Sequence, residues 1–361
     1  MYYKIATEKF NNLVKNHKTQ DVYVLGIESS CDETSIAVVK NGREVLSNVI
    51  ASQIDIHSRF GGVVPEVASR NHLMCINNVL NESLQKANVE LKQIDAIAVT
   101  YGAGLMGALM VGVNFAKSLA YALNIPLIKV NHIKGHISAN YIATPELKPP
   151  FISLVVSGGH TAIVRVDDYV SNTLIGSTVD DAIGEAYDKV AKVLGLGYPG
   201  GPIVDKTAKL GTNNIVFVKK DVLKNSFNFS YSGLKTAVIN YLHNLKQHNT
   251  QPNVADVCAS FQHEAVKALV DKSIRACKKF KLKTLAVAGG VAANSYLRSQ
   301  LTEAGNAEGI TVLFPPMVLC TDNAAMIACE GYNNIISGEG LADLSLTATP
   351  NLHLKYSVLK K

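Results

Sequence analysis

The sequence is poor in cysteine and has no tryptophan. Its six cysteines are scattered among 361 residues, and no two of them form a C-x-x-C pair. Cysteines this sparse cannot form a disulfide framework, and they lack the spacing of a zinc ribbon. The pattern therefore favours a reducing compartment.

Charge of either sign is also scarce. Charged residues make up 18% of the chain, and 35 Lys and Arg against 29 Asp and Glu leave a net charge of +6. Together with 47% hydrophobic residues, this is the composition of a globular protein rather than a disordered one. The small basic excess permits nucleic acid or nucleotide phosphates as partners, but surface lysines that only aid solubility would produce it equally well.

We expect no targeting signal in the first residues of the sequence. Residues 1–20 have no apolar segment of the kind that a secretory signal needs. They also contain Glu8 and no arginine, which disfavours a mitochondrial transit peptide. We therefore expect a cytoplasmic protein whose residues 1–20 and 355–361 are solvated tails.

One long uncharged segment resembles a membrane-spanning helix in its length and lack of charge. Residues 96–116 contain no charged side chain, but four glycines interrupt them. A buried strand, a glycine turn and a tightly packed helix explain the stretch better. We expect it to belong to the core.

The order of patterns along the chain predicts duplicated lobes. Residues 22–39 and 151–166 each consist of two β-branched apolar runs joined by a short polar loop, as in a hairpin, and residues 284–294 form a strand followed by a glycine turn. Helical periodicity fills residues 70–87, 180–194 and 254–278. These patterns predict an α/β protein of two duplicated lobes with a ligand cleft between them.

The boundary between the lobes is expected at Lys148-Pro149-Pro150. The expected parts of the chain are an extension at 1–21, a first lobe at 22–149 that a helix at about 324–346 completes, a second lobe at 150–323 and a tail at 347–361.

A pair of histidines is the first candidate site. His132 and His136 are spaced i, i+4, so on a helix they share one face within reach of a single metal ion. The alternative is two surface histidines at the start of a helix. Ile133 occupies the place where a zincin peptidase has its glutamate base, which argues against peptidase chemistry. Asp322, in a polar loop after the strand at 311–314, is the attractive third ligand, because two histidines and one carboxylate leave coordination positions open.

Glycine turns after strands are the second candidate. Ser157-Gly158-Gly159 follows a buried strand, so its amides could approach an anion, although any tight hairpin could use the same residues. Gly289-Gly290 and Gly200-Gly201 form similar turns. Together the turns indicate a phosphate-binding protein more strongly than any one of them does.

Acidic residues accompany these turns. Asp32 and Glu33 lie in the first hairpin loop, and Asp188 lies two turns into a predicted helix, too far from its start for a simple dipole effect. Asp205 follows the Gly200-Gly201 turn, where a carboxylate could bind ribose hydroxyls. Cys31 could be a nucleophile, but no adjacent histidine base is evident, and a small buried thiol is the simpler interpretation.

Taken together, eight segments in order resemble the tRNA N6-adenosine threonylcarbamoyltransferase family, formerly labelled O-sialoglycoprotein endopeptidase. They are GIESSCDETSIAVV, FGGVVPEVASRNHL, VNHIKGHISANY, LVVSGGHT, DDAIGEAYDKVAKVLGLGYPGGP, FSYSGLKTAV, AGGVAANSYLR and CTDNAAMIA. The resemblance implies an actin-like fold of the sugar-kinase and Hsp70-type ATPase class. It also implies transfer of a threonylcarbamoyl group from threonylcarbamoyl-AMP to N6 of adenosine-37 of tRNA, with release of AMP.

The resemblance assigns roles by motif position. His132, His136 and Asp322 would hold a divalent metal, Fe²⁺ rather than Zn²⁺, and Asp32 and Glu33 would be the acidic pair near the reacting centre. The adenylate would be bound by Val155, Val156, Ser157, Gly158, Gly159, Asp188, Gly201, Asp205 and Asn294. The implied partners are tRNA, a catalytically degenerate paralogous subunit and a P-loop ATPase subunit. The family often has glutamate between the two histidines, where this chain has Lys134.

Two other functions stay open at this point. The same fold could serve an ATP-dependent kinase or ATPase, in which Asp32 would orient water or a hydroxyl. A non-catalytic nucleotide-binding scaffold in an RNA-modification complex is the other alternative.

Overall fold

The computed structural model describes residues 2–217, 223–352 and 354, which form two compact units. The first unit comprises the described residues up to Pro149, together with Asp168–Ser171 and Pro315–Leu354. The second unit comprises Pro150–Asp167 and Asn172–Phe314.

The first unit contains a six-stranded sheet in the order β11-β5-β4-β1-β2-β3. β2 is antiparallel to β1 and β3, whereas β1, β4 and β5 run parallel. The strands are β1 (Tyr23–Glu28), β2 (Glu33–Lys40), β3 (Glu44–Ser52), β4 (Ala96–Gly102), β5 (Leu127–Asn131) and β11 (Leu341–Ala342). The helices are α1 (Tyr2–Asn16), α2 (Ile54–Ser58), α3 (Pro65–Ala87), η1 (Leu91–Gln93), α4 (Met106–Leu123), α5 (His132–Ala143), α11 (Met317–Cys320) and α12 (Ala324–Ile336).

The second unit repeats this topology. Its sheet has the order β10-β9-β6-β7-β8, with β7 antiparallel to β6 and β8, and with β6, β9 and β10 parallel. The strands are β6 (Phe151–Val156), β7 (Thr161–Val166), β8 (Asn172–Ser177), β9 (Thr284–Ala288) and β10 (Thr311–Leu313). The helices are α6 (Ile183–Val193), α7 (Gly200–Ala208), α8 (Ser232–Gln247), α9 (Val254–Phe280), η2 (Gly290–Ala293) and α10 (Ser295–Ala307). The two predicted hairpins are therefore β1–β2 and β6–β7, and the predicted duplication is confirmed.

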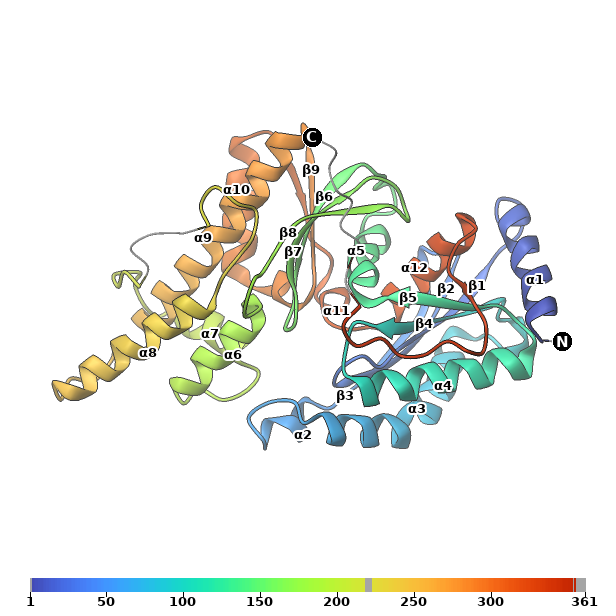
Figure 1. Cartoon of the computed structure of the whole chain (residues 1–361), viewed down its shortest axis with the longest axis horizontal. Helices are drawn as coiled ribbons and strands as arrows, with labels where there is room; N and C mark the ends of the chain where they lie inside the picture. Colours follow the sequence, from blue (N-terminus) through green and yellow to red (C-terminus); the bar gives the residue numbers. More distant parts are fainter. Residues whose placement is uncertain (1, 218–222, 353, 355–361) are drawn as a thin grey trace. The chain divides into compact units, whose positions relative to one another are not determined.

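Both faces of the first sheet are buried, which explains its nearly continuous apolar strands. α3 and α4 cover one face (Figure 1). Ile76 of α3 and Val113 of α4 belong to the same buried apolar cluster as Leu25 of β1. α12 covers the other face, where Ile327 packs with Val24. α12 approaches β1 so closely that a Cβ atom on Gly26 would lie 2.2 Å from the carbonyl oxygen of Ala324. This close approach brings the loop before α12 to the carboxyl end of β1.

The uncharged stretch at 96–116 is confirmed as strand, turn and helix. It forms β4 and the first part of α4. Among the described residues, α4 is the one helix long and apolar enough to span a membrane. Ala108, Leu109 and Val113 of that helix are buried in the unit, as expected of a core helix.

The expectation of a solvated amino-terminal tail is wrong. Residues 2–16 form α1, which buries Tyr2, Ala6, Phe10 and Leu13 along one face. The Tyr2 hydroxyl donates a hydrogen bond to the carbonyl oxygen of Ile125. Burying this apolar stripe stabilises the helix, so α1 is an integral part of the unit. At the other end of the chain, α12 ends at Ile336 rather than near residue 346.

Candidate metal centre and nucleotide-binding turns

The two candidate histidines lie on the first turns of α5. Asn131 ends β5 and caps the helix, because its side-chain oxygen accepts a hydrogen bond from the amide of Ile133. His132 is 5% exposed and His136 is 0% exposed. The alternative of two surface histidines is therefore wrong.

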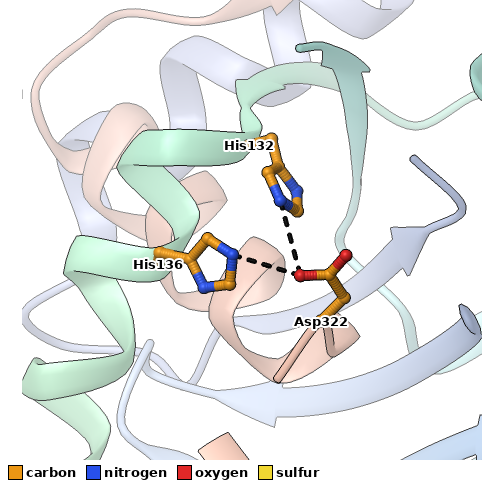
Figure 2. Close-up of side chains that lie close together, drawn as sticks. All are labelled: His132, His136 and Asp322. Carbon is orange, nitrogen blue, oxygen red and sulfur yellow. Dashed lines mark ion pairs between the residues drawn. The ribbon is translucent and has the colours of Figure 1, made fainter. Parts of the chain in front are cut away.

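Asp322 meets both rings from the loop between α11 and α12. Its Oδ1 atom lies 3.1 Å from Nε2 of His136 and 3.5 Å from Nε2 of His132 (Figure 2). The two rings approach edge to face, with centroids 4.6 Å apart. One ligand atom from each of the three residues lies within 4.8 Å of the others, as three ligands of a single ion would.

The donor set and its hydrogen bonds suit a metal. Both ring nitrogens of His136 are buried without a hydrogen bond among the described residues, although Nε2 lies close to the Asp322 carboxylate. A buried ring that faces a carboxylate without a hydrogen bond is poorly satisfied unless a cation lies between them. Two imidazoles and one carboxylate are ligands for Fe²⁺ or Zn²⁺ and leave positions open for substrate.

The local charges also favour a cation. Burial would raise the pKa of Asp322, but the neighbouring rings of His132 and His136 hold it well below its usual range. Burial would lower the pKa of His132, but Asp322 and Glu28 raise it well above its usual range. The two carboxylates therefore favour a positive charge at this position.

Glu28 is the site residue that sequence analysis missed. It ends β1, is fully buried, and places Oε2 3.1 Å from Nδ1 of His132. The signal was present in the sequence, because a carboxylate directly after the buried apolar run of a strand needs a partner.

The acidic pair lies between β1 and β2, beside the same site. Asp32 is 7% exposed, and Glu33 begins β2. Burial and the neighbouring carboxylates of Asp322 and Asp32 raise the pKa of Glu33 to about 10. Without an ion, Glu33 is therefore protonated at neutral pH and can donate a hydrogen bond rather than accept a proton.

A histidine does lie near Cys31 in space, contrary to the expectation from the sequence. His72 of α3 places Nε2 2.9 Å from the carbonyl oxygen of Cys31, and its Nδ1 lies 2.6 Å from the Thr34 hydroxyl. The ring thus holds the loop that carries Asp32 rather than activating the thiol. Burial and the nearby carboxylates raise the pKa of Cys31 well above its usual range, which is the opposite of what a nucleophilic cysteine needs.

In the second unit, the Ser157-Gly158-Gly159 turn joins β6 to β7. The Ser157 amide donates to the carbonyl oxygen of His160, and the Ser157 hydroxyl accepts from the His160 amide. A Cβ atom on Gly158 or Gly159 would meet no protein atom within 4 Å. Packing within the described structure therefore does not explain why either residue is glycine. The close approach of a bound ligand would explain it.

Val155 and Val156 support this turn from within the sheet. Both side chains are fully buried in β6. Any contact of these two residues with an adenylate would therefore be through the backbone, and the expectation that they line its site stays a prediction.

The expected nucleoside residues of the second unit fall into two local groups. Asp188 of α6 accepts a hydrogen bond from the Gly200 amide, next to Gly201. Asp205 of α7 accepts from the amide and hydroxyl of Ser295, which directly follows Asn294.

Asn294 is held firmly in place. Its side-chain oxygen accepts from the Leu297 amide, and its side-chain amide donates to Gln262. Its first contribution is therefore to cap α10 and to fix the turn after η2.

Comparison with known proteins identifies the family. Residues 44–329 match the TsaD family, described as tRNA N6-adenosine threonylcarbamoyltransferase. A protein of that name from Clostridium perfringens is 57% identical over 332 residues, which cover 92% of this chain and 98% of the relative. One from Clostridioides difficile is 54% identical over 335 residues, which cover 92% and 99%.

Solved structures at low identity share the fold. HypF from T. kodakarensis superimposes with a TM-score of 0.61 at 14% identity, covering 90% of this chain and 49% of that protein. Component A of (R)-2-hydroxyglutaryl-CoA dehydratase from Acidaminococcus fermentans has a TM-score of 0.53 at 14% identity, covering 87% and 99%. The fold is actin-like, as the resemblance implied. The family model and the 57% identity to a relative over 92% of the chain agree with this fold. The chain therefore belongs to the tRNA N6-adenosine threonylcarbamoyltransferase family.

Proposed function

We propose that this protein transfers the threonylcarbamoyl group of threonylcarbamoyl-AMP to N6 of adenosine-37, in tRNAs that read codons starting with adenine, and releases AMP. The identity of 57% over 92% of the chain carries this proposal. The buried cluster of His132, His136 and Asp322 supports it, because an acyl transfer needs a group that polarises the acyl oxygen.

A divalent ion, Fe²⁺ rather than Zn²⁺, would be held by His132, His136 and Asp322. When bound, it would supply Lewis-acid polarisation of the acyl carbonyl. Two histidines and one carboxylate with open positions are the ligand set of many non-haem Fe²⁺ proteins.

The chain's own residues would then stabilise the leaving phosphate of AMP and accept the proton of the adenine amine. The adenine amine is a weak nucleophile, because its lone pair is delocalised into the ring, so departure of the phosphate must be assisted. The Gly158 and Gly159 amides would stabilise the developing charge on that phosphate. Asp188, Gly201, Asp205 and Asn294 would support the nucleoside, and Val155, Val156 and Ser157 would hold the turn. Asp32 and Glu33 are the candidates for the group that accepts the proton of the amine.

Protein partners would complete the system. Leu73 and Met74 of α3 and Met106 and Met110 of α4 are 49–79% exposed. These four side chains form what we call the α3/α4 apolar surface, and α3 packs against α4. We propose that a paralogous, catalytically degenerate subunit packs on this surface. A P-loop ATPase subunit would be the other partner, and the complex would act on tRNA in the cytoplasm.

Reconstitution with purified threonylcarbamoyl-AMP and unmodified tRNA tests the reaction. Modified adenosine and released AMP are measured for the wild type, with and without candidate partner subunits, together with bound metal. We expect His136→Ala to keep the fold while losing metal and modification together, because it removes a buried ligand. His243→Ala changes an exposed histidine of α8 and should match the wild type in every measurement.

The outcomes separate the alternatives. Wild-type modification without bound metal would contradict the metal site. Rapid ATP hydrolysis by the isolated chain, without tRNA or adenylate, would favour a kinase or ATPase. Full modification by His136→Ala would favour a non-catalytic scaffold.

A further inference from the structure

We propose that Glu28 is a positioning residue that fixes the tautomer of His132, so that Nε2 of that ring carries the lone pair that binds the metal. The inference rests on the proposed metal site and adds a residue outside the three ligands.

Glu28 is held rigidly by three groups. Its Oε1 atom accepts a hydrogen bond from the Ser30 amide at 2.5 Å. Its Oε2 atom accepts from the Thr100 hydroxyl at 2.6 Å and lies 3.1 Å from Nδ1 of His132. The side chain is 0% exposed, so water does not compete for these bonds.

This arrangement dictates which nitrogen of His132 carries a proton. An ionised carboxylate only accepts hydrogen bonds, so Nδ1 must be the protonated nitrogen that faces Glu28. The neutral ring then has its lone pair on Nε2, the nitrogen that faces Asp322. A carboxylate behind a ligating histidine fixes the ring orientation and raises its basicity in many metal sites.

The two histidines differ in this respect. Nδ1 of His136 is buried without a hydrogen bond among the described residues. Glu28 therefore controls His132 alone, and its loss should weaken metal binding without abolishing it.

Glu28→Gln is the informative substitution, because it keeps the volume and changes one oxygen to an amide nitrogen. The Ser30 amide can only donate, so the Gln oxygen must face it. The Gln NH₂ then faces Thr100, whose hydroxyl can turn to accept, and Nδ1 of His132. The Ser30 hydroxyl lies 3.2 Å from Nδ1 and can accept a hydrogen bond as well as donate one, so by itself it does not fix the tautomer. The Gln NH₂ can only donate, so it favours a neutral ring with its lone pair on Nδ1 and its proton on Nε2, where the proton blocks the metal.

Thr100→Val is the matched control. It has a similar shape and also removes a hydrogen bond from buried Oε2. It leaves the contact between the carboxylate and His132 intact. The two variants disturb the same buried site, but only Glu28→Gln changes the tautomer.

The test is titration of the metal-free full-length proteins with Zn²⁺ and, without oxygen, with Fe²⁺, alongside thermal unfolding in the absence of metal. We expect Glu28→Gln to raise the Kd by about 10- to 100-fold, and Thr100→Val to stay within about threefold of the wild type. In ¹⁵N spectra of the Zn²⁺-loaded wild type, Nδ1 of His132 should carry the proton.

Each failure has its own meaning. No metal binding by the wild type would overturn the proposed metal site itself. Equal affinity of the wild type and Glu28→Gln, or equal losses in both variants, would overturn the role of Glu28 and leave the metal site standing. If Glu28→Gln does not fold, the spectrum still decides, because protonated Nε2 in the loaded wild type contradicts the inference.

Discussion

Two glycines of the second unit, Gly158 and Gly200, differ in how much space the protein leaves for a side chain. A Cβ atom on Gly158 would meet no protein atom within 4 Å. A Cβ atom on Gly200 would lie 2.7 Å from Cβ of Ala191 and 2.7 Å from Cα of Asp188. Packing of the chain explains the second glycine, and a bound ligand would explain the first.

Alanine should therefore lower the activity at position 158 and the stability at position 200. We expect Gly158→Ala to leave the free energy of unfolding within about 0.5 kcal/mol of the wild type, and to lower kcat/KM by roughly 100-fold, because it crowds the phosphate-binding amides. Gly200→Ala should instead cost about 1–3 kcal/mol of stability through overpacking. Denaturant unfolding and modification kinetics check both, and full activity of Gly158→Ala would rule out the turn as the phosphate site.

α12 packs against α5, the helix that carries the histidines, and this packing encloses another buried carboxylate. Glu330 of α12 is 2% exposed and accepts a hydrogen bond from the Ser138 hydroxyl of α5. Burial raises its pKa to about 7, against the opposing charges of Lys134 and Arg43. Lys134 of α5 thus places a positive charge near a buried acid and partly offsets the effect of burial.

The stability of the protein should depend on the protonation of Glu330. Below pH 4.5 the carboxyl is protonated in both the folded and the unfolded chain. Between pH 4.5 and about 7 the unfolded chain releases the proton first, so stability falls as the pH rises through this window. The full loss is roughly 3 kcal/mol above pH 7.

Glu330→Gln should remove this dependence. We expect the variant to gain stability relative to the wild type as the pH rises from 4.5 to 7, because it has no buried charge to create. Denaturant unfolding across that range measures the difference, with the exposed Glu339→Gln as a control. A difference between wild type and Glu330→Gln that does not change with pH would contradict the assignment.

For the whole molecule, the α3/α4 apolar surface is the proposed contact with a partner subunit. Met74 is 79% exposed, so it contributes little to the fold of the isolated chain. A partner that covers it would exclude water from the side chain, and a charge placed there would then be expensive.

Met74→Asp should therefore weaken association and leave the fold intact. We expect the affinity for the paralogous subunit to fall by at least about tenfold, with the free energy of unfolding within about 0.5 kcal/mol of the wild type. Asn12→Asp adds the same charge to an exposed position of α1 and should bind normally. Calorimetric titration compares the two, and unchanged binding by Met74→Asp would place the partner elsewhere.

Local patterns were enough to predict the repeated hairpins and most helices. Alternation and turn residues identify β1–β2 and β6–β7, because a strand and its hairpin neighbour are close in sequence. The amphipathic stripe of Tyr2, Ala6, Phe10 and Leu13 was equally readable, but its charged neighbours led to the prediction of a tail. Helical spacing alone placed His132 and His136 on one face.

The residues that follow each strand can be predicted from the sequence, because strands and turns are local properties of the chain. Tertiary structure decided which of them meet. α12 can lie against β1 because Gly26 has no side chain. This contact and the packing of α12 on α5 bring Asp322 to the two histidines. Burial, which no local pattern reports, then raises the pKa of Glu33 and places Glu28 against His132.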